Sequence, residues 1–385
     1  MRIVHTADWH IGKIINDYSM LEDQKYYFDQ FILNLQEIKP DALLISGDLY
    51  DRSIPASEAI SLLNSILCRI VLDLKIKTFI IAGNHDSKER LAFVGDLLEQ
   101  SGLYMAGNIT DKIKSIPIQS NNQIANIYML PYIEPHNVKM VFPDANPKTH
   151  NDAIHFYCEK ALSELDKNAI NILMVHGLFQ VNQLTDLLDD EQSVGGSEMV
   201  DASIFGEFDY VAIGHLHSHR TIGSEKMLYS GSPLKYSIDE ATQTKSYTIV
   251  DIDADKNVSI QTKQIKPLRD IRIIEGSFDY LSNRNNHQNL NDYVFANITD
   301  DTITLHAIAI LRSIFPNILG LKYINLDTKN IDNTVQSKSS VEQLSEMELF
   351  ANFYHNVLDT SLNPQEMEYV SEVMGMLKGE EYDSN

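Results

Sequence analysis

The feature that most constrains the fold of this chain is the stretch Ile80-Ile81-Ala82-Gly83-Asn84-His85-Asp86. It is an apolar, β-branched run that stops at a glycine and then presents an amide, an imidazole and a carboxylate. This pattern predicts a buried strand whose carboxyl end opens into a polar site. A fold that contains this stretch must place a buried sheet beside a group of polar side chains.

The same pattern recurs four more times along the chain. Apolar runs lead directly into polar residues at Arg2–Thr6 (followed by Asp8 and His10), Ala42–Ser46 (followed by Asp48), Ile170–Val175 (followed by His176) and Tyr210–Ile213 (followed by His215 and His217). Because the carboxyl ends of parallel strands meet at one edge of a sheet, these side chains could share one rim.

Amphipathic segments lie between the first strands. Apolar spacing predicts helices over residues 21–38, 57–74, 89–100 and 153–165, and a loop-rich segment over 102–122. The order strand, helix, strand, helix, strand indicates an α/β layered fold with parallel strands and crossover helices.

The length of 385 residues predicts more than one domain, since single cores stop growing at roughly 250 to 300 residues. Composition shifts near Pro267, which predicts a main domain over 1–265, a small α+β domain over 266–327 and a polar linker over 328–340. Amphipathic helices are expected in a tail over 341–385, which has one lysine and ten acidic residues. Such a tail suggests a docking element for a partner, and the alternative is a helical hairpin that folds onto its own chain.

The formal net charge of −23 argues against a chain that binds nucleic acid by bulk electrostatics alone, because such binding neutralises phosphates with Lys and Arg. Its two cysteines lie far from the polar clusters, so neither a disulfide framework nor a cysteine metal site is expected, and a reducing cytoplasm fits. Neither a signal peptide nor an apolar run of transmembrane length is apparent.

The polar residues at the strand ends are oxygen and nitrogen donors suited to Mn, Fe or Zn. Two such ions can clamp an in-line displacement at phosphorus, and they need about seven protein ligands with one bridging carboxylate. The chain supplies Asp8, His10, Asp48, Asn84, His176, His215 and His217. Asp48 is placed where its carboxylate can reach both ions. Because side chains alternate along a strand, the two members of each pair separated by one residue, Asp8 with His10 and His215 with His217, can point the same way.

Three further residues lie beside these ligands. His85 is left over as a stabiliser of the transition state or an acid to the leaving oxygen. Asp86 could orient His85 through a hydrogen bond, or could simply cap a helix. Arg52 could contact phosphate, or could form a surface ion pair with Asp51 or Glu58. The segment 183–196 is expected to be a surface loop near the site, and its Gly195-Gly196 pair could let the backbone approach a substrate, or could simply form a turn.

These motifs resemble the five ordered motifs of the calcineurin-like metallophosphoesterases. They are Asp8-x-His10, Gly47-Asp48, Gly83-Asn84-His85-Asp86, His176 and Gly214-His215-x-His217, over roughly the first 220 residues. The flanking residues, such as His5-Thr6-Ala7-Asp8-Trp9-His10 and Tyr229-Ser230-Gly231-Ser232-Pro233, resemble more closely the SbcD family of bacterial nuclease subunits. This closer resemblance covers nearly the whole chain.

The resemblance implies a fold in which helices flank two sheets, with a small capping domain and a helical C-terminal tail. It also implies a manganese-dependent, dimeric DNA nuclease that works with the coiled-coil ATPase SbcC in a heterotetramer of two copies of each subunit. Its implied activities are double-strand exonuclease and single-strand endonuclease, in DNA end processing, hairpin cleavage, replication, recombination and repair. Residues 266–327 would border the DNA, and residues 341–385 would bind the ATPase.

The resemblance also implies a role for each motif residue. Asp8, His10, Asp48 and His217 would hold one ion, and Asp48, Asn84, His176 and His215 the other. His85 matches the family's catalytic histidine, and dimers would pair through helices near residues 57–74 and 89–100. The alternatives are a small-molecule phosphodiesterase or phosphatase of the same fold, and a metal-bound docking scaffold with little catalysis of its own.

Overall fold

The computed structural model describes residues 1–93, 95–120, 123–181 and 198–325, and a few residues between 350 and 370. The predicted loop over 183–196, the linker over 328–340 and most of the tail over 341–385 lie outside the described residues. Among the helices of the described part, none is long and apolar enough to cross a lipid bilayer.

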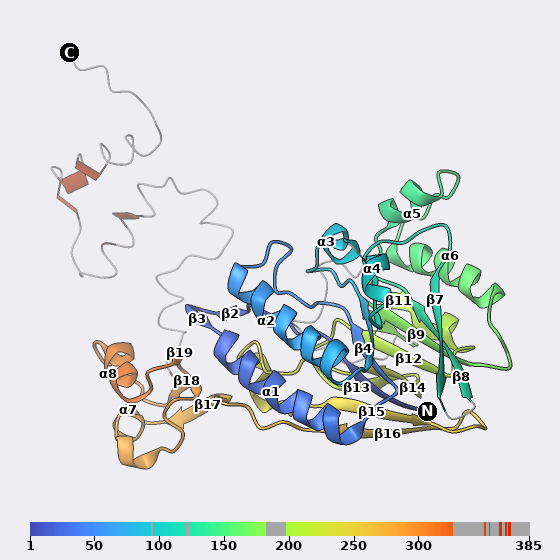
Figure 1. The fold of residues 1–385 in the computed structure, drawn as a ribbon. Coiled ribbons are helices and arrows are strands. Elements are labelled where there is room, and N and C mark those ends of the chain that lie inside the picture. Colours follow the sequence, from blue (N-terminus) through green and yellow to red (C-terminus); the bar gives the residue numbers. More distant parts are fainter. Residues whose placement is uncertain are drawn as a thin grey trace. The chain divides into compact units, whose positions relative to one another are not determined.

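Two sheets of six strands each form the centre of the fold (Figure 1). The first has the order β16 (Val258–Lys263), β15 (Tyr247–Ile252), β1 (Arg2–Thr6), β4 (Ala42–Ser46), β5 (Lys77–Ile81) and β6 (Leu103–Ala106). The second has the order β13 (Arg220–Ile222), β14 (Ser224–Tyr229), β12 (Tyr210–Gly214), β9 (Ile170–His176), β8 (Gln123–Met129) and β7 (Lys114–Ser120). Strands β1, β4, β5 and β6 run parallel in the first sheet, and β8, β9, β12 and β14 in the second.

The side chains of each strand alternate between two cores, as the period of two requires. In β4, Leu44 packs in the core between the two sheets, whereas Leu43 and Ile45 pack on the opposite face. In β12, Ala212 faces the core between the sheets, and Val211 and Ile213 face away from it. The central strands β4, β9 and β12 are therefore buried on two faces, which explains why they are almost uniformly apolar.

Helices cover the outer face of each sheet (Figure 1). Helices α1 (Leu21–Ile38) and α2 (Ser57–Cys68) pack on the first sheet, and α5 (Pro135–Val141) and α6 (His150–Ser163) on the second. The predicted layered α/β sandwich, with helices flanking two sheets, is confirmed. Short pairs complete this part: β2 (Ile14–Ile15) with β3 (Tyr18–Ser19), and β10 (Phe179–Gln180) with β11 (Val200–Asp201).

Several predicted elements differ in extent. The helix expected over 89–100 is two short helices, α3 (Lys88–Ala92) and α4 (Gly95–Glu99), because the backbone of Phe93 is extended (φ −60°, ψ 128°). The helix expected over 57–74 ends as α2 at Cys68 and continues as a π-helical turn, Arg69–Asp73. The loop expected over 102–122 was wrong in part, since it contains β6 and β7, which pair with buried neighbours.

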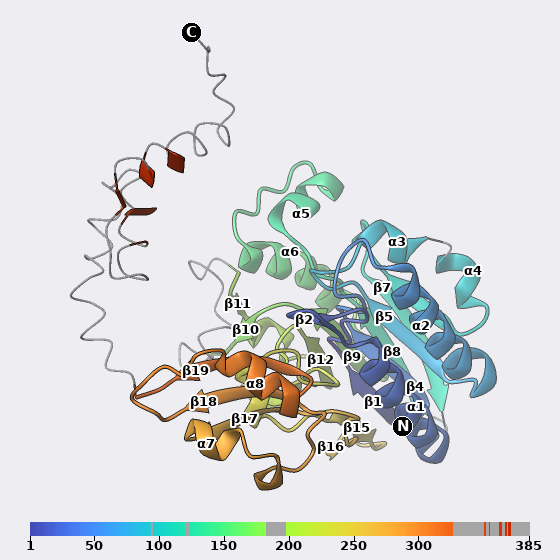
Figure 2. The same cartoon turned by 90° about the vertical axis from the view of Figure 1, so that its left-hand side faces the viewer.

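A third sheet has the order β17 (Ile271–Gly276), β18 (Tyr293–Ile298) and β19 (Ile318–Tyr323), accompanied by α7 (Phe278–Leu281) and α8 (Ala307–Ile314) (Figure 2). The chain divides into two compact units. The first comprises Met1–Ile274, Leu281–Ala296 and Ile308–Leu321, and the second comprises Glu275–Tyr280, Asn297–Ala307 and the described residues from Lys322 onward. The predicted domain limits at residues 265 and 327 stay predictions.

Candidate metal centre

The seven predicted ligands lie together at the rim where the carboxyl ends of β1, β4, β5, β9 and β12 meet. The two sheets are joined there by short polar contacts: Ser46 Oγ donates to Ala212 O (3.0 Å), and His176 Nδ1 donates to Ser46 O (2.8 Å). The backbone N–H of His215 donates to both carboxylate oxygens of Asp8 (3.0 and 3.1 Å). Side chains from opposite sheets therefore face one site.

The backbone at this rim is unusual. Asp8, His10, Asp48 and His215 all have positive φ (54°, 43°, 51° and 113°), a region that residues other than glycine rarely adopt. Such conformations cost on the order of 1–3 kcal/mol each and cluster at functional sites. Strand β1 ends at Thr6 and β12 at Gly214, so the strand period does not direct these side chains as predicted. Left-handed turns beyond the strand ends direct them instead.

Two glycines allow this close packing. A Cβ on Gly47, which has φ +93°, would lie 2.2 Å from His176 Nδ1, and a Cβ on Gly214 would lie 1.9 Å from Ser46 O. Both positions therefore need glycine if the imidazole of His176 is to reach the rim.

The donor atoms form two groups with Asp48 between them. In one group, His10 Nε2 and His217 Nε2 are 3.1 Å apart. In the other, Asn84 Oδ1 lies 2.9 Å from His176 Nε2 and 3.2 Å from His215 Nδ1. Asp48 Oδ2 is 3.6 Å from His10 Nε2 and 3.4 Å from His176 Nε2. One carboxylate oxygen thus lies within reach of both groups.

The electrostatics of the site suit divalent cations. Asp8 and Asp48 are 0% and 2% exposed, and within the part of the chain that the structure describes no Lys or Arg forms an ion pair with either. Burial raises the pKa of Asp8 to about 7, against the opposing charges of His176 and His217. Burial would also raise the pKa of Asp48, but the charge and hydrogen bond of His176 hold it well below its usual range.

The same surroundings shift the pKa values of the histidines in opposite directions. Burial lowers the pKa of His10 well below its usual value and that of His215 to about 3, so both rings are neutral and can donate a lone pair. Burial would lower the pKa of His176 too, but Asp48 and Asp8 outweigh it and raise this pKa to about 9. Ligand atoms of Asp8, Asp48 and His176 all lie within 4.8 Å of one another. Buried carboxylates that have no Lys or Arg partner among the described residues, beside the neutral imidazoles of His10 and His215, fit a metal site.

His85 is exposed beside this cluster, at the end of β5. Its backbone N–H donates to Asp48 Oδ1 (3.0 Å), and its ring Nδ1 donates to Asp51 O (3.0 Å). Its ring meets the ring of His10 edge to face, with 4.9 Å between centroids. The carbonyl of Asp51 therefore sets the orientation of this imidazole and leaves its Nε2 available to a substrate.

Asp86 fits neither interpretation that its sequence position suggested. Its buried carboxylate accepts three backbone hydrogen bonds, from Gly83 (3.0 Å), Leu49 (3.2 Å) and Tyr50 (3.1 Å). Helix α3 has Ser87 at its N-cap position, without a side-chain cap. Asp86 instead joins the loops that follow β4 and β5, because its carboxylate accepts hydrogen bonds from backbone N–H groups of both loops.

Arg52 is mostly exposed. Its side chain is 73% exposed, with Nε 3.7 Å from Asp51 Oδ2, so it forms the surface ion pair considered as an alternative. A contact between Arg52 and phosphate stays a prediction.

Sequence reasoning missed the residues that support the ligands from outside. Gln24 Nε2 donates to His10 O (2.8 Å) and Tyr236 OH donates to Trp9 O (2.5 Å), which holds the turn that carries Asp8 and His10. Glu240, in the 3-10 turn Asp239–Thr242, accepts a hydrogen bond from His217. Burial would raise the pKa of Glu240, but His217 and Lys245 lower it to about 2. These partners lie far from the motifs in sequence and carry no local signal.

Comparisons of the sequence with known proteins identify the family of this chain. Residues 1–219 match the calcineurin-like phosphoesterase family, and residues 267–357 match the type 5 capsule protein repressor C-terminal domain. The chain is 34% identical over 381 residues to the D subunit of nuclease SbcCD from Staphylococcus epidermidis, covering 98% of this chain and 99% of that protein. It is also similar to the crystal structure of TT1561 of Thermus thermophilus, with 13% identity and a TM-score of 0.40 over 68% of this chain and 98% of that one. The chain therefore belongs to the calcineurin-like phosphoesterases, within the SbcD family of nuclease subunits.

Proposed function

We propose that this protein is a two-metal, manganese-dependent DNA nuclease subunit. The observation that carries the proposal is the position of Asp48, whose Oδ2 lies 3.6 Å from His10 Nε2 and 3.4 Å from His176 Nε2. A carboxylate between two groups of nitrogen donors is what a pair of bridged ions requires. The family and the 34% identical relative named as a nuclease direct that chemistry toward phosphodiester bonds in DNA.

The ligands divide between the two ions as the donor groups do. Asp8, His10, Asp48 and His217 would hold one ion, and Asp48, Asn84, His176 and His215 the other. Mixed oxygen and nitrogen donors of this kind suit manganese. When bound, the ions supply activation of water and stabilisation of the charge that develops on the phosphoryl oxygens.

The residues of the chain provide the remaining chemistry. His85 would donate a proton to the leaving oxygen or stabilise the transition state, because its ring is fixed through Nδ1 and is exposed beside Asp48. Trp9 and Tyr236 are buried, and the hydroxyl of Tyr236 donates to the backbone carbonyl of Trp9, which holds the turn that carries Asp8 and His10. The ligands are therefore preorganised before a substrate arrives.

DNA binding would be shared with a partner, since the chain carries a formal net charge of −23. The name of the relative includes the SbcCD complex, which supports an SbcC-type coiled-coil ATPase as that partner, in a heterotetramer with two copies of each subunit. Residues 266–327 would cap the DNA and residues 341–385 would bind the ATPase. ATP-dependent double-strand exonuclease and single-strand endonuclease activities would then serve DNA end processing, recombination and repair in the cytoplasm.

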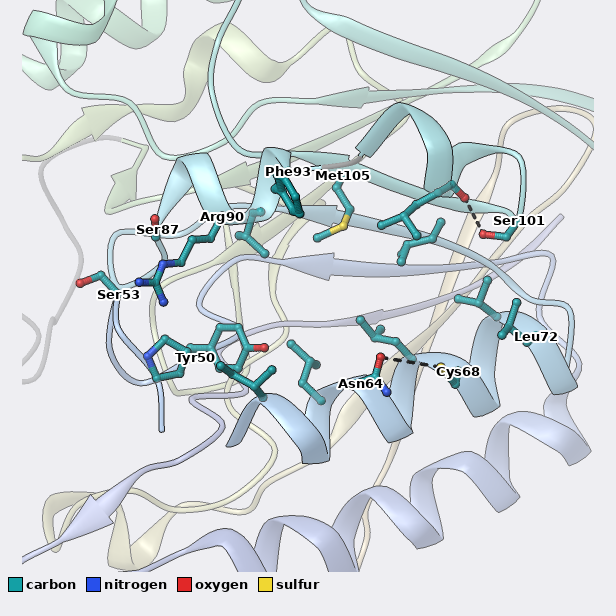
Figure 3. Close-up of a pocket in the computed structure, with 18 residues that line it drawn as sticks. Tyr50, Ser53, Asn64, Cys68, Leu72, Ser87, Arg90, Phe93, Ser101 and Met105 are labelled. Atoms are coloured by element: carbon teal, nitrogen blue, oxygen red, sulfur yellow. Dashed lines mark hydrogen bonds between the residues drawn. The ribbon is translucent and has the colours of Figure 1, made fainter. Parts of the chain in front are cut away.

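A homodimer would form at an apolar groove between α2, with the π-helical turn that follows it, and the α3–α4 segment. The groove has a volume of about 470 Å³, and Figure 3 shows Asn64, Cys68 and Leu72 across it from Phe93 and Met105. Among the apolar residues that line it, Phe93 is 73% exposed, Leu72 47% and Ile60 44%, so the groove presents exposed apolar surface. A second copy of the chain would bury it.

The decisive experiment measures cleavage of linear duplex DNA, a single-stranded circle and bis-p-nitrophenyl phosphate, with Mn, Mg or chelator, with and without the ATPase and ATP. We expect metal-dependent DNA cleavage, greatest with Mn and enhanced on duplex ends by the ATPase and ATP. Turnover of the small ester with DNA intact under every condition would make the protein a small-molecule phosphodiesterase. Metal binding with no turnover of any substrate would make it a docking scaffold.

A further inference from the structure

Three contacts form a closed loop around His217, the ligand at the end of the β12 motif. His217 Nδ1 donates to Glu240 Oε1 (2.9 Å), Glu240 Oε2 lies 2.5 Å from Lys245 Nζ, and Lys245 Nζ donates to His217 O (2.8 Å). These contacts therefore hold both the ring and the backbone carbonyl of His217.

The loop is buried. The side chains of Glu240 and Lys245 are 7% and 8% exposed, so their ion pair is shielded from solvent and from screening by salt. The backbone carbonyl of His217 also accepts from the N–H of Ser232 (3.1 Å). The position of this histidine is thus set from several sides by segments outside its own motif.

The hydrogen bond to Glu240 decides which nitrogen of the ring can bind a metal. Because Nδ1 carries the shared proton, the lone pair stays on Nε2. That Nε2 is the atom that lies 3.1 Å from His10 Nε2 in the donor group. An imidazole that donates to a carboxylate is also a more basic ligand.

We propose that Glu240 is a positioning residue for the metal held by His10 and His217, and that Lys245 positions Glu240. This inference rests on the proposed two-metal function and adds residues to it that lie outside the five motifs. A purely structural ion pair would stabilise the fold equally but would leave the metal affinity unchanged. The two interpretations differ in what happens to metal binding when the carboxylate is lost.

The test is titration calorimetry of Mn²⁺ into the metal-stripped, full-length protein, comparing wild type, Glu240→Gln and Asp239→Asn. Glu240→Gln keeps the size of the side chain and removes its charge. Asp239→Asn removes the same charge from the neighbouring residue of the same turn, which is less buried. We expect one of two Mn²⁺ affinities to fall by about 10- to 100-fold in Glu240→Gln alone. Affinities like those of the wild type at both sites would overturn the proposal.

A second measurement needs no variant. Long-range ¹H–¹⁵N spectra of the histidine rings in the stripped wild-type protein should show His217 with its proton on Nδ1. A His217 ring with its neutral proton on Nε2 would overturn the proposal even if Glu240→Gln failed to fold.

The outcome can be separated from that of the proposed function. Wild-type protein that binds two Mn²⁺ ions, with the expected loss in Glu240→Gln, but cuts no DNA would sustain the role of Glu240 and reject the nuclease. If the wild type and Glu240→Gln instead cut DNA with the same Mn²⁺ requirement, the nuclease function would stand and the role of Glu240 would be rejected.

Discussion

At the scale of single residues, the site depends on polar side chains held in backbone conformations that are costly by themselves. Asp8, His10 and Asp48 have φ of 54°, 43° and 51°, and each is almost completely buried. Only surroundings that over-determine these conformations can maintain them. The hydrogen bonds from His215 N to Asp8 and from His85 N to Asp48 are part of that constraint.

Replacing His85 by glutamine should reduce DNA cleavage by about 10²- to 10⁴-fold, because the side chain can no longer donate or accept a proton in the reaction. Metal content, measured by elemental analysis of the purified protein, should stay at the wild-type level. His136→Gln is the matched control, since His136 is an exposed histidine on α5 with a side chain 63% exposed. Loss of metal together with activity would instead make His85 a structural part of the metal site.

Replacing Gly47 by alanine should destabilise the protein. The added Cβ would lie 2.2 Å from His176 Nδ1, at a residue with φ +93°. Overpacking of this kind costs about 1–3 kcal/mol, and the positive φ adds to that. Urea unfolding of the metal-stripped protein measures the change.

Gly95→Ala is the control for Gly47→Ala, because nothing lies within 4 Å of a Cβ at that position and Gly95 begins helix α4. It should be neutral or slightly stabilising. Equal unfolding free energies for Gly47→Ala and wild type would mean that His176 has room to move.

At the scale of elements, the break between α3 and α4 changes the surface of the molecule. A continuous helix over 89–100 would have placed its apolar residues on one face. The extended backbone at Phe93 instead leaves this ring 73% exposed at the groove, across from Leu72 of the π-helical turn (Figure 3). The usual interpretation of amphipathic spacing as core packing therefore fails there.

Replacing Phe93 by glutamate should raise the dimer dissociation constant by at least about 10-fold, because a charge would be buried without a partner in the interface. Sedimentation velocity over a range of concentrations measures the constant. Met140→Glu provides the comparison, since Met140 is 78% exposed on α5, away from the groove. If both variants associate as the wild type does, the groove is not the interface.

At the scale of the whole molecule, the site exists only because two sheets meet. The first sheet contributes Asp8, His10, Asp48 and Asn84, and the second contributes His176, His215 and His217. The hydrogen bonds from His176 Nδ1 to Ser46 O (2.8 Å) and from Ser46 Oγ to Ala212 O (3.0 Å) join the two sheets there. The core between the sheets, which includes Leu44, Phe79 and Ile172, keeps the two halves of the site in register.

Deleting Val341–Asn385 should leave the intrinsic Mn-dependent cleavage in place and remove binding of the ATPase. The expectation rests on the sequence of the tail, because its apolar positions and acidic charge suggest a docking element. Co-elution of each form with the purified ATPase, beside assays of cleavage without ATPase, measures both properties. Unchanged co-elution would assign the docking surface to another part of the chain.

The sequence was sufficient to single out the seven polar side chains that lie together at the rim, and their role as metal ligands stays a prediction. An apolar, β-branched run that ends in glycine and a metal-binding side chain is a local signal, and it recurs along the chain. The sequence was not sufficient for Glu240. This residue follows His217 by 23 residues, and only the tertiary fold brings the two side chains into contact. The sequence also left two roles open for Asp86, a hydrogen bond to His85 and a helix cap, and the structure shows neither, because the three N–H groups that donate to it cannot be seen in the sequence.

The sequence by itself determined which residues could bind metal, the parallel strands that end at them and the main flanking helices, because the strand and helix periods are local properties of the chain. Only the tertiary structure decided that Asp48 lies between two groups of donors, that left-handed turns direct Asp8 and His10, and that Lys245 and Glu240 hold His217. Those features depend on burial and on contacts between residues far apart in sequence, and no local period encodes them.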